Sequence, residues 1–328
     1  MKQIRVEDAV GLTLCQDITR IVPEKMKGPQ FRKGYVVQAE DIPKLKALGK
    51  EHIYVWEEQA GMVHENDAAQ RLADLCGKTG FARSDVSEGK IELSAEYDGL
   101  FRIDLARFFE VNLIPDVIIA ARPSLTPVKA GDKLAGMRVI PLVIPEERLQ
   151  EAERIAGDAP LFSLLPYTMQ TAGVVVTGGE IANGAIPDAF IPFLTEKLGN
   201  YGLRIGKRLF SGDGLGDIVN GIEEIRADKP DLIFCTGGMS VDPDDNTPGA
   251  IKRSGAEIVT YGAPVLPGSM FLLGYYPDGV PVMGLPGGIM FHKHRNSVLD
   301  LVLPRIAAGL RMSKKDFALL GNGGLCLD

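Results

Sequence analysis

The stretch DLIFCTGGMS, residues 231–240, decides the fold of the C-terminal half of the chain. It opens with an apolar run of the length and composition that is typical of a short buried strand. Two glycines follow at once, and a helical pattern covers about 247–254 before a further strand at 257–260. The stretch therefore predicts a strand, a glycine loop and a helix in direct succession.

The same order occurs upstream of this stretch. A strand at 173–176 leads through a glycine loop at 177–185 into a helix at 187–198. A strand at 203–209 leads through Gly212-Asp213-Gly214 into a helix that ends near 227. Strands that alternate with helices over short loops indicate an α/β fold with a doubly wound, mostly parallel sheet. Ligands of such sheets sit at the carboxyl ends of the strands.

The rest of the chain divides into smaller regions. We expect a small α+β N-terminal unit at 1–57, a middle α+β region at 58–168, the α/β domain at 169–310 and a C-terminal tail at 311–328. Within the α/β domain, residues 262–288 are expected to form a hairpin-like excursion and residues 290–308 a terminal helix. The middle region carries no chemical signature, so the α/β domain is the place to look for a site.

Composition and charge restrict the classes of partner. The net charge is −7, and no stretch combines basic and aromatic residues, so nucleic acid is not an expected partner. No uncharged apolar stretch reaches the about 20 residues of a membrane helix, and the N-terminus lacks the apolar core of a signal peptide. We therefore expect a cytoplasmic protein, away from membranes, that binds any anionic ligand through local donors or a metal.

The loop after the central strand is the first candidate site. Consecutive Gly237 and Gly238 let the backbone turn sharply and aim its N–H groups at one point, which suits an anion. The hydroxyls of Thr236 and Ser240 flank these glycines and can donate as well. An ordinary strand-to-helix turn is the alternative interpretation.

An acidic cluster follows this loop. Asp242, Asp244 and Asp245 place three carboxylates close together, with Pro243 between them. Crowded like charges are unfavourable unless solvent, a helix N-terminus or a cation offsets them. One hypothesis is that they hold Mg²⁺, which would bridge to a bound phosphate or oxyanion. The alternative is that Asp245 caps the helix that follows.

Two more acidic residues lie at predicted strand ends. Glu180 closes the loop Thr177-Gly178-Gly179-Glu180 and either accepts hydrogen bonds from a ligand or is an ordinary exposed carboxylate. Asp213 lies between two glycines and either contributes to the site or caps a helix.

The loop Leu285-Pro286-Gly287-Gly288 precedes the terminal helix, whose free N–H groups suit an anion. The following segment, His292-Lys293-His294-Arg295, supplies either cations for a ligand or an exposed helix face.

These motifs resemble those of molybdopterin-binding domains. The family's order is kept by Thr177-Gly178-Gly179-Glu180, Gly237-Gly238-Met239-Ser240-Val241, Asp245, Pro267-Gly268 and Leu285-Pro286-Gly287-Gly288. The pattern is similar in particular to the molybdopterin molybdenumtransferases, which ligate molybdate to adenylylated molybdopterin with Mg²⁺. The resemblance covers about residues 173 to 309 and implies a small-molecule pterin phosphate as ligand.

The resemblance also implies a role for each motif. Glu180, Asp213 and Asp245 would be the catalytic residues that handle metal and molybdate. The cofactor-binding residues would be Thr177, Gly178, Gly179, Thr236, Gly237, Gly238, Met239, Ser240, Pro267, Gly268, Pro286, Gly287 and Gly288. A homodimer is implied too, with a molybdoenzyme or a cofactor-synthesis protein as a further partner.

The chain departs from the transferase motifs at three positions. Gly179 stands where the family has Asp, Ser269 where it has Lys, and Gly288 where it has Asn. These departures favour a non-enzymatic carrier or chaperone of the molybdenum cofactor as an alternative. A nucleotide pyrophosphatase of the competence/damage-inducible type, acting on ADP-ribose or similar nucleotides, is another, because its comparable loop ends like Pro243-Asp244-Asp245.

Overall fold

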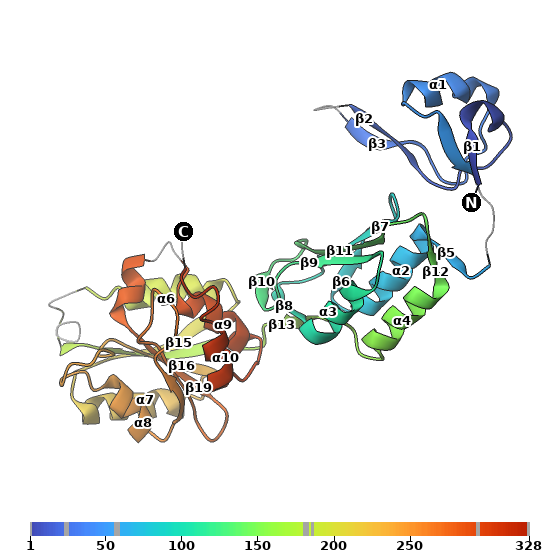
Figure 1. The fold of residues 1–328 in the computed structure, drawn as a ribbon. Coiled ribbons are helices and arrows are strands. Elements are labelled where there is room, and N and C mark those ends of the chain that lie inside the picture. The colour runs from blue at the N-terminus through green and yellow to red at the C-terminus, as the bar shows by residue number, and fades with distance from the viewer. Residues whose placement is uncertain are drawn as a thin grey trace. The chain divides into compact units, whose positions relative to one another are not determined.

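The structure is a computed structural model that describes residues 2–22, 26–55, 60–179, 184, 187–292 and 296–326. The chain forms two compact units (Figure 1). The first comprises Met1–Tyr97 and Phe101–Leu164, and the second Asp98–Leu100 and Leu165–Asp328. The predicted division into four regions stays a prediction.

The first part of unit 1 contains short strands and helices around its own small core. Antiparallel pairs join β1 to β4 and β2 to β3. Val6, Leu14, Ile18, Leu45 and Ile53 fill the core between them. The elements are β1 (Lys2–Arg5), η1 (Val6–Asp8), β2 (Ile18–Val22), β3 (Met26–Phe31), η2 (Ala39–Asp41), α1 (Ile42–Ala47) and β4 (His52–Val55).

The second part of unit 1 is a separate α+β arrangement with its own core. Its largest sheet has the order β6-β7-β11-β9, and α2 packs against β7 and β11 through buried Ala69, Leu72 and Cys76. Smaller sheets join β10-β8-β13 and β12-β5. The elements are β5 (Met62–His64), α2 (Glu65–Cys76), β6 (Phe81–Arg83), β7 (Lys90–Ala95), β8 (Gly99–Ile103), α3 (Leu105–Leu113), β9 (Val117–Ala121), β10 (Thr126–Val128), β11 (Lys133–Val139), β12 (Val143–Pro145), α4 (Glu146–Ala156) and β13 (Phe162–Pro166).

Unit 2 is built on a six-stranded sheet of order β15-β14-β16-β19-β18-β17. The pairs among β15, β14, β16 and β19 are parallel, and β18 runs antiparallel to both β19 and β17. The elements are β14 (Thr171–Thr177), α6 (Phe190–Gly199), β15 (Arg204–Ser211), α7 (Leu215–Ala227), β16 (Leu232–Thr236), α8 (Thr247–Arg253), β17 (Glu257–Tyr261), β18 (Leu272–Tyr275), β19 (Pro281–Leu285), η3 (Gly287–His292), α9 (Val298–Ala307) and α10 (Lys314–Leu319).

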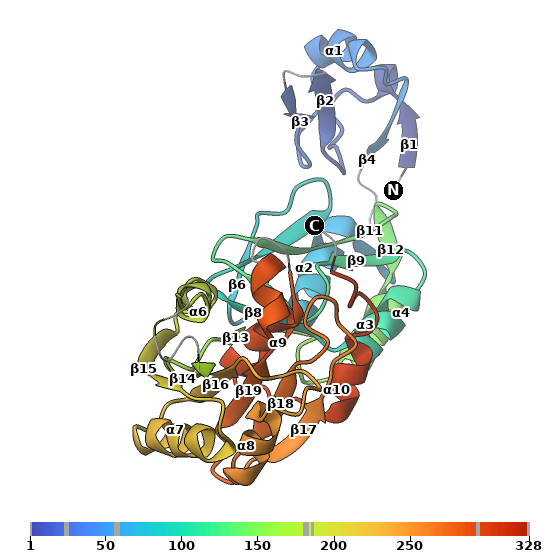
Figure 2. The same ribbon diagram turned by 90° about the vertical axis from the view of Figure 1, so that its left-hand side faces the viewer.

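Helices cover both faces of this sheet, as the alternating pattern predicted. On one face, α6, α9 and α10 pack against inward residues such as Val174 and Phe234. On the other face, α7 and α8 pack against residues whose side chains point the opposite way, such as Val175 and Ile233 (Figures 1 and 2). Because successive side chains of a strand alternate in direction, one apolar run feeds both cores. The α/β fold with a doubly wound, mostly parallel sheet is confirmed.

The end of this unit differs from the expectation. Residues 262–288 contain the expected hairpin, formed by β18 and β19, but it is part of the sheet, since β19 is also the parallel neighbour of β16. The expected helix at 290–308 is divided, because η3 ends at His292 and α9 begins only at Val298. Ser297 caps α9 and forms a reciprocal capping box with Asp300, which fixes the helix start. Apolar periodicity alone did not reveal that start.

None of the helices in the described part of the chain combines the length and apolar character that crossing a bilayer requires.

Candidate functional site

Four parallel strands of unit 2 end in register at one edge of the sheet. Thr177 of β14 pairs with Ser211 of β15, and Thr236 of β16 pairs with both Val176 and Leu285. The loops after these strands are the ones that the sequence indicated. We call this edge the carboxyl edge.

Hydrogen bonds join these loops to one another. The Thr177 hydroxyl donates to Thr236 O at 2.8 Å, and Gly237 N donates to Leu285 O at 3.2 Å. Gly178 N donates to Ser211 O, also at 3.2 Å. The loops after β14, β15, β16 and β19 are therefore brought together, as the sequence predicted for strand ends.

The central loop requires its two glycines. Gly237 and Gly238 have φ angles of 83° and 55°, which residues with side chains rarely adopt. A Cβ atom on Gly237 would lie 2.9 Å from the carbonyl oxygen of Thr177, and one on Gly238 would lie 2.9 Å from Thr247 Oγ1. The glycines thus allow the loop to pass close against its neighbours, where a methyl group would collide.

Asp245 holds this loop rather than capping the next helix. Its Oδ2 accepts a hydrogen bond from Ser240 N at 2.7 Å. The cap position of α8 belongs to Asn246, so the interpretation of Asp245 as a helix cap is wrong. A Cβ on Gly238 would lie 3.7 Å from Asp245 Oδ1, which places the second carboxylate oxygen beside the glycines.

Asp213 holds the first glycine loop in the same way. Its Oδ2 accepts a hydrogen bond from Gly179 N at 2.8 Å, and the cap position of α7 belongs to Gly214. The side chain of Asn246 donates to Asp213 O at 2.9 Å and so links this turn to the Asp245 segment. Two carboxylates that are 32 positions apart in the sequence are thereby tied into one network.

The other two carboxylates of the acidic cluster are placed differently. Asp242 and Asp244 are exposed, and their backbone carbonyls accept hydrogen bonds from Asp245 N and Asn246 N. Within the described ranges, no three His, Cys, Asp or Glu side chains are grouped so that they could hold a metal ion. That Asp242, Asp244 and Asp245 together hold Mg²⁺ therefore stays a prediction, and the contact that the structure shows is the one between the Asp245 carboxylate and Ser240 N.

One hydroxyl at this edge is buried without a partner. Thr236 is fully buried, and its Oγ1 has no hydrogen-bond partner among the residues that the structure describes. Buried polar groups are nearly always paired, so an unpaired one requires an explanation. Three residues further along the chain, the buried Met239 side chain lies against Gly284. A Cβ on Gly284 would lie 2.6 Å from the Met239 side chain, so the glycine provides the space for it.

A residue that the sequence did not indicate also holds the central loop. The Tyr261 hydroxyl donates to Met239 O at 2.9 Å and lies 3.2 Å from Ser240 O. Burial, followed by the charge of Asp245, raises the pKa of this phenol above its usual value. Tyr261 ends β17, at the far edge of the sheet in strand order, so no local motif connects it with the loop.

The remaining motif residues lie near the start of α9. A Cβ on Gly268 would collide with Val298 Cγ1 and lie 3.2 Å from Ile289 Cγ2, so the Pro267–Gly268 turn packs between η3 and α9. Gly287 and Gly288 begin η3 with open space around them, and Pro286 O accepts from Ile289 N. Glu180, Lys293, His294 and Arg295 lie outside the described residues.

A cavity of about 660 Å³ lies at the opposite edge of the same sheet, not beside the glycine loops. Asp231 and Pro281, at the beginnings of β16 and β19, contribute to its lining, and we call this edge the amino edge. Three of its charged groups already have partners: Arg226 forms an ion pair with Asp278 at 3.0 Å, and Asp231 accepts from Gln170 N and Thr171 N. The chemistry favours the carboxyl edge over this cavity.

Comparison with known proteins concerns the domain as a whole. Residues 173–308 match a family model described as a probable molybdopterin binding domain, and residues 3–57 match one described as a domain of unknown function, DUF8806. The chain is 34% identical over 89 residues to a CinA-like protein of Mycolicibacterium vanbaalenii, covering 27% of this chain and 21% of that protein. A CinA-like protein of Thermotoga neapolitana is 34% identical over 88 residues, or 26% of this chain and 21% of that protein. The chain thus spans about a fifth of the length of these curated relatives.

Solved structures of lower similarity were also found. The molybdopterin biosynthesis enzyme MoaB of Thermus thermophilus is 20% identical, with a TM-score of 0.36 over 43% of this chain and 98% of that one. The molybdopterin biosynthesis Mog protein of Mycobacterium ulcerans is 19% identical, with a TM-score of 0.36 over 43% and 96%. The family model carries the assignment: residues 173–308 of this chain are a domain of the probable molybdopterin-binding family.

Proposed function

We propose that the carboxyl edge of unit 2 binds the phosphate-bearing part of adenylylated molybdopterin. The observation that carries the proposal is the paired network in which Asp213 holds Gly179 N and Asp245 holds Ser240 N, with Asn246 joining the two. Such a network fixes both glycine loops before the ligand arrives, so that binding requires little further ordering of the loops. The buried hydroxyl of Thr236 adds a donor that a ligand oxygen would satisfy.

The same network supports a role for Mg²⁺. Two carboxylates repel a phosphate ligand unless a cation lies between them. Mg²⁺ commonly takes one or two carboxylates together with substrate phosphates and water, rather than a complete protein cage. Asp213 and Asp245 fit that arrangement, because each uses one oxygen to hold a loop and has a second one to offer. Bound Mg²⁺ would supply positive charge to the ligand's phosphates.

We further propose that this domain inserts molybdate into the bound ligand with release of AMP. The position of the Asp213 and Asp245 carboxylates beside the glycine loops supports a catalytic role for these two residues. The carrier alternative is supported by Gly179 and Ser269, which replace an acidic and a basic residue of the transferase motif. Similarity to CinA-like proteins supports the third hypothesis, hydrolysis of a nucleotide such as ADP-ribose.

One assay separates the three functions. The full chain is incubated with adenylylated molybdopterin, Mg²⁺ and molybdate, and AMP is followed by chromatography. Release of AMP that depends on molybdate supports insertion. Tight binding without release supports a carrier, and hydrolysis of ADP-ribose without pterin binding excludes both.

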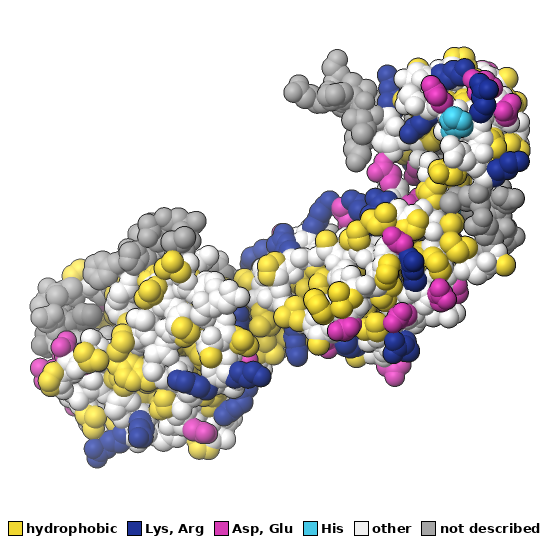
Figure 3. Space-filling view, viewed as in Figure 1, with side chains coloured by type: hydrophobic (Ala, Val, Ile, Leu, Met, Phe, Trp, Pro, Cys, Tyr) yellow, Lys and Arg dark blue, Asp and Glu magenta, His cyan; other side chains and the backbone are white. Residues whose placement is uncertain are grey.

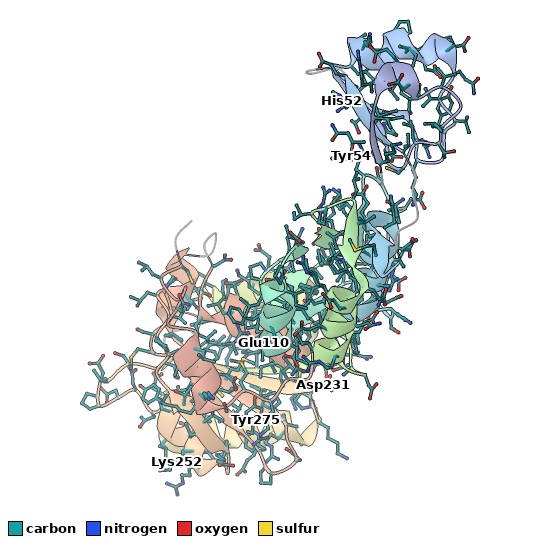
Figure 4. All side chains as sticks on the ribbon, turned by 45° about the vertical axis from the view of Figure 1, so that its right-hand side comes forward. His52, Tyr54, Glu110, Asp231, Lys252 and Tyr275 are labelled. Atoms are coloured by element: carbon teal, nitrogen blue, oxygen red, sulfur yellow. The ribbon has the colours of Figure 1, made fainter. Side chains whose placement is uncertain are left out.

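Amide variants test the two carboxylates. Asp213→Asn and Asp245→Asn each keep an oxygen that can accept the loop N–H, but they remove the charge. We expect each to lower AMP release by about 10²-fold, the usual scale for losing one electrostatic group of a catalytic site. Asp231→Asn is the matched control, because its carboxylate also accepts backbone N–H groups but at the amino edge (Figure 4). Equal losses in all three variants would reject the proposed role.

Three further expectations stay predictions beside this proposal. They are the homodimer, the molybdoenzyme or cofactor-synthesis protein as partner, and the cytoplasmic location. Pro267, Gly268, Pro286, Gly287 and Gly288 are proposed as the opposite wall of the ligand site, since η3 begins directly after β19.

A further inference from the structure

An aromatic ring lies exposed beside the central glycine loop. Tyr261 is the last residue of β17 and is 42% exposed. Figure 3 shows hydrophobic side chains scattered over the visible face of unit 2, so exposure alone does not distinguish this residue. The position of its strand and the contacts of its hydroxyl do.

The direction of β17 brings Tyr261 to the carboxyl edge. β18 runs antiparallel to both β19 and β17, so β17 runs in the same direction as β19 and β16. Tyr261 pairs with Leu272, and Leu272 pairs with Gly284, one residue before the end of β19. The side chain of Tyr261 therefore starts at the level of the sheet where the parallel strands end.

The hydroxyl of Tyr261 fixes the ring against the central loop. It donates to Met239 O at 2.9 Å and lies 3.2 Å from Ser240 O. Ser240 is also held through its N–H, which donates to Asp245 Oδ2. The tip of the ring thus lies at the residue that the carboxylate network holds. A ring that is already held in place loses little freedom when a ligand binds to it.

The segments on either side of the ring belong to the proposed ligand site. Val241 follows Ser240 directly and is 84% exposed, so an apolar side chain extends from the loop next to the carbonyl that the hydroxyl contacts. In the other direction, the chain leaves Tyr261 for the segment that carries Pro267 and Gly268, the proposed opposite wall of the site. Tyr261 therefore lies where the glycine loop and that wall are connected.

The proposed ligand combines the two kinds of group that such a surface suits. Its phosphates suit the backbone N–H groups of a glycine loop. Its heterocycles are flat, and flat heterocycles stack on aromatic side chains with a sizeable gain in affinity. The charged part and the flat part of one molecule would then be bound on neighbouring surfaces of the same loop.

We infer that the Tyr261 ring is the stacking surface for a planar heterocycle of the ligand, beside the phosphate site at the glycine loops. The inference rests on the proposed function and adds to it a residue that selects phosphate esters with a flat ring over those without one. Adenine and pterin are the two rings of adenylylated molybdopterin that share this chemistry.

Titration of the full chain in the presence of Mg²⁺ tests the inference with three ligands. They are AMP for the adenine ring, molybdopterin for the pterin ring, and pyrophosphate, which has no ring. Tyr261→Leu should weaken binding of a ring-bearing ligand about tenfold or more, the scale of one lost base–aromatic stack, and leave pyrophosphate binding unchanged. A loss with AMP assigns the adenine ring to Tyr261, and a loss with molybdopterin assigns the pterin ring.

Two further variants serve as controls. Tyr261→Phe keeps the ring but not the hydroxyl, so it should bind the ring-bearing ligand more tightly than Tyr261→Leu does. Tyr54→Leu should bind all three ligands as the wild type does, because Tyr54 is 40% exposed but belongs to unit 1 (Figure 4). Circular dichroism verifies that each variant is folded.

A fluorescence signal tests the position of the ring without relying on affinity. Trp56 is the one tryptophan of the chain. Tyr261→Trp in a Trp56→Phe background therefore places the only indole at the proposed stacking surface. Its emission should be quenched by the ring-bearing ligand and not by pyrophosphate. If Tyr261→Leu does not fold, this signal decides alone.

Failure of the inference is distinguishable from failure of the proposed function. A wild-type chain that binds neither AMP nor molybdopterin rejects both. The inference alone is overturned when the wild type binds these ligands and Tyr261→Leu binds them as tightly, when Tyr261→Phe is as weak as Tyr261→Leu, or when no ring-bearing ligand quenches the emission of the Tyr261→Trp variant.

Discussion

The two edges of the sheet in unit 2 use the same local device with different surroundings. At the amino edge, Asp231 accepts hydrogen bonds from Gln170 N and Thr171 N at 2.9 and 2.8 Å. At the carboxyl edge, Asp245 accepts from Ser240 N at 2.7 Å. A carboxylate that binds backbone N–H groups is therefore no sign of function by itself.

The surroundings separate the two edges. Beside Asp231, Arg226 forms an ion pair with Asp278. Beside Asp245, glycines in left-handed conformations pass close to neighbouring backbone, and a buried hydroxyl has no partner in the described part of the chain. The carboxyl edge holds a close backbone passage that only glycine permits and an unpaired polar group that folding alone would disfavour, and an unpaired buried group requires an explanation.

Glycine substitutions give the largest expected contrast between the edges. Gly237 and Gly279 have nearly equal φ angles, 83° and 88°, but only a Cβ on Gly237 would meet other atoms within 4 Å. Gly279→Ala should cost about 1 to 2 kcal/mol for the backbone conformation alone. Gly237→Ala should cost about 1 to 3 kcal/mol more, because its methyl group collides with the Thr177 carbonyl. Urea unfolding of the two variants measures the difference.

Ligand binding extends this comparison. Gly237→Ala should also weaken binding of adenylylated molybdopterin, since the displaced loop no longer aims its N–H groups together, whereas Gly279→Ala should bind as the wild type does. Equal unfolding energies and equal affinities would show that the close passage at Gly237 has no special importance.

Removal of the unpaired Thr236 hydroxyl should change stability and ligand affinity in opposite directions. Thr236→Val keeps the shape of the side chain and removes a buried polar group, so the protein should become about 1 kcal/mol more stable. Affinity for the ligand should fall by about tenfold, the usual worth of one hydrogen bond to a charged group. Thermal unfolding and ligand titration measure the two effects.

Thr177→Val is the matched control for this change. The Thr177 hydroxyl donates to Thr236 O at 2.8 Å, so its removal should destabilise the protein by about 1 kcal/mol. If Thr236→Val destabilises the protein as much as Thr177→Val, the Thr236 hydroxyl has a partner in solution and is not reserved for a ligand.

The arrangement of strands and loops at the carboxyl edge could be predicted from the sequence, whereas the contacts between these loops could not. The apolar run at 232–235 followed by Gly237 and Gly238 predicted a buried strand and a tight loop, because few other residues permit that turn. Parallel strands then place such loops at one edge. Which backbone groups the carboxylates hold depends on strand register and loop path, which no local pattern encodes.

Three residues illustrate that limit. Asp245 had two sequence interpretations, a helix cap or a metal ligand, and the structure adds a third, the support of Ser240 N. The Tyr261 hydroxyl contacts the loop although β17 is an edge strand of the sheet, a contact that depends on the order of the strands and not on any nearby sequence. Val298 begins α9 later than the apolar pattern indicated, because the Ser297 capping box overrides periodicity there.

The smallest expected effect tests the amino edge by itself. Burial raises the pKa of Asp231, but hydrogen bonds from Gln170 and Thr171 outweigh it and lower the pKa below the usual value. A lowered pKa stabilises the folded state above the ordinary carboxyl pKa of about 4, and that stability is lost as the pH falls through the folded pKa. Asp231→Asn should thus be less stable than the wild type at pH 7, by under about 1 kcal/mol since Asp231 is exposed. The difference should shrink as urea unfolding is repeated toward pH 3, while AMP release at pH 7 stays near the wild-type rate. A difference that is constant from pH 7 to 3 would show that the Asp231 charge contributes nothing, and the contrast between the edges would then rest on the glycine loops alone.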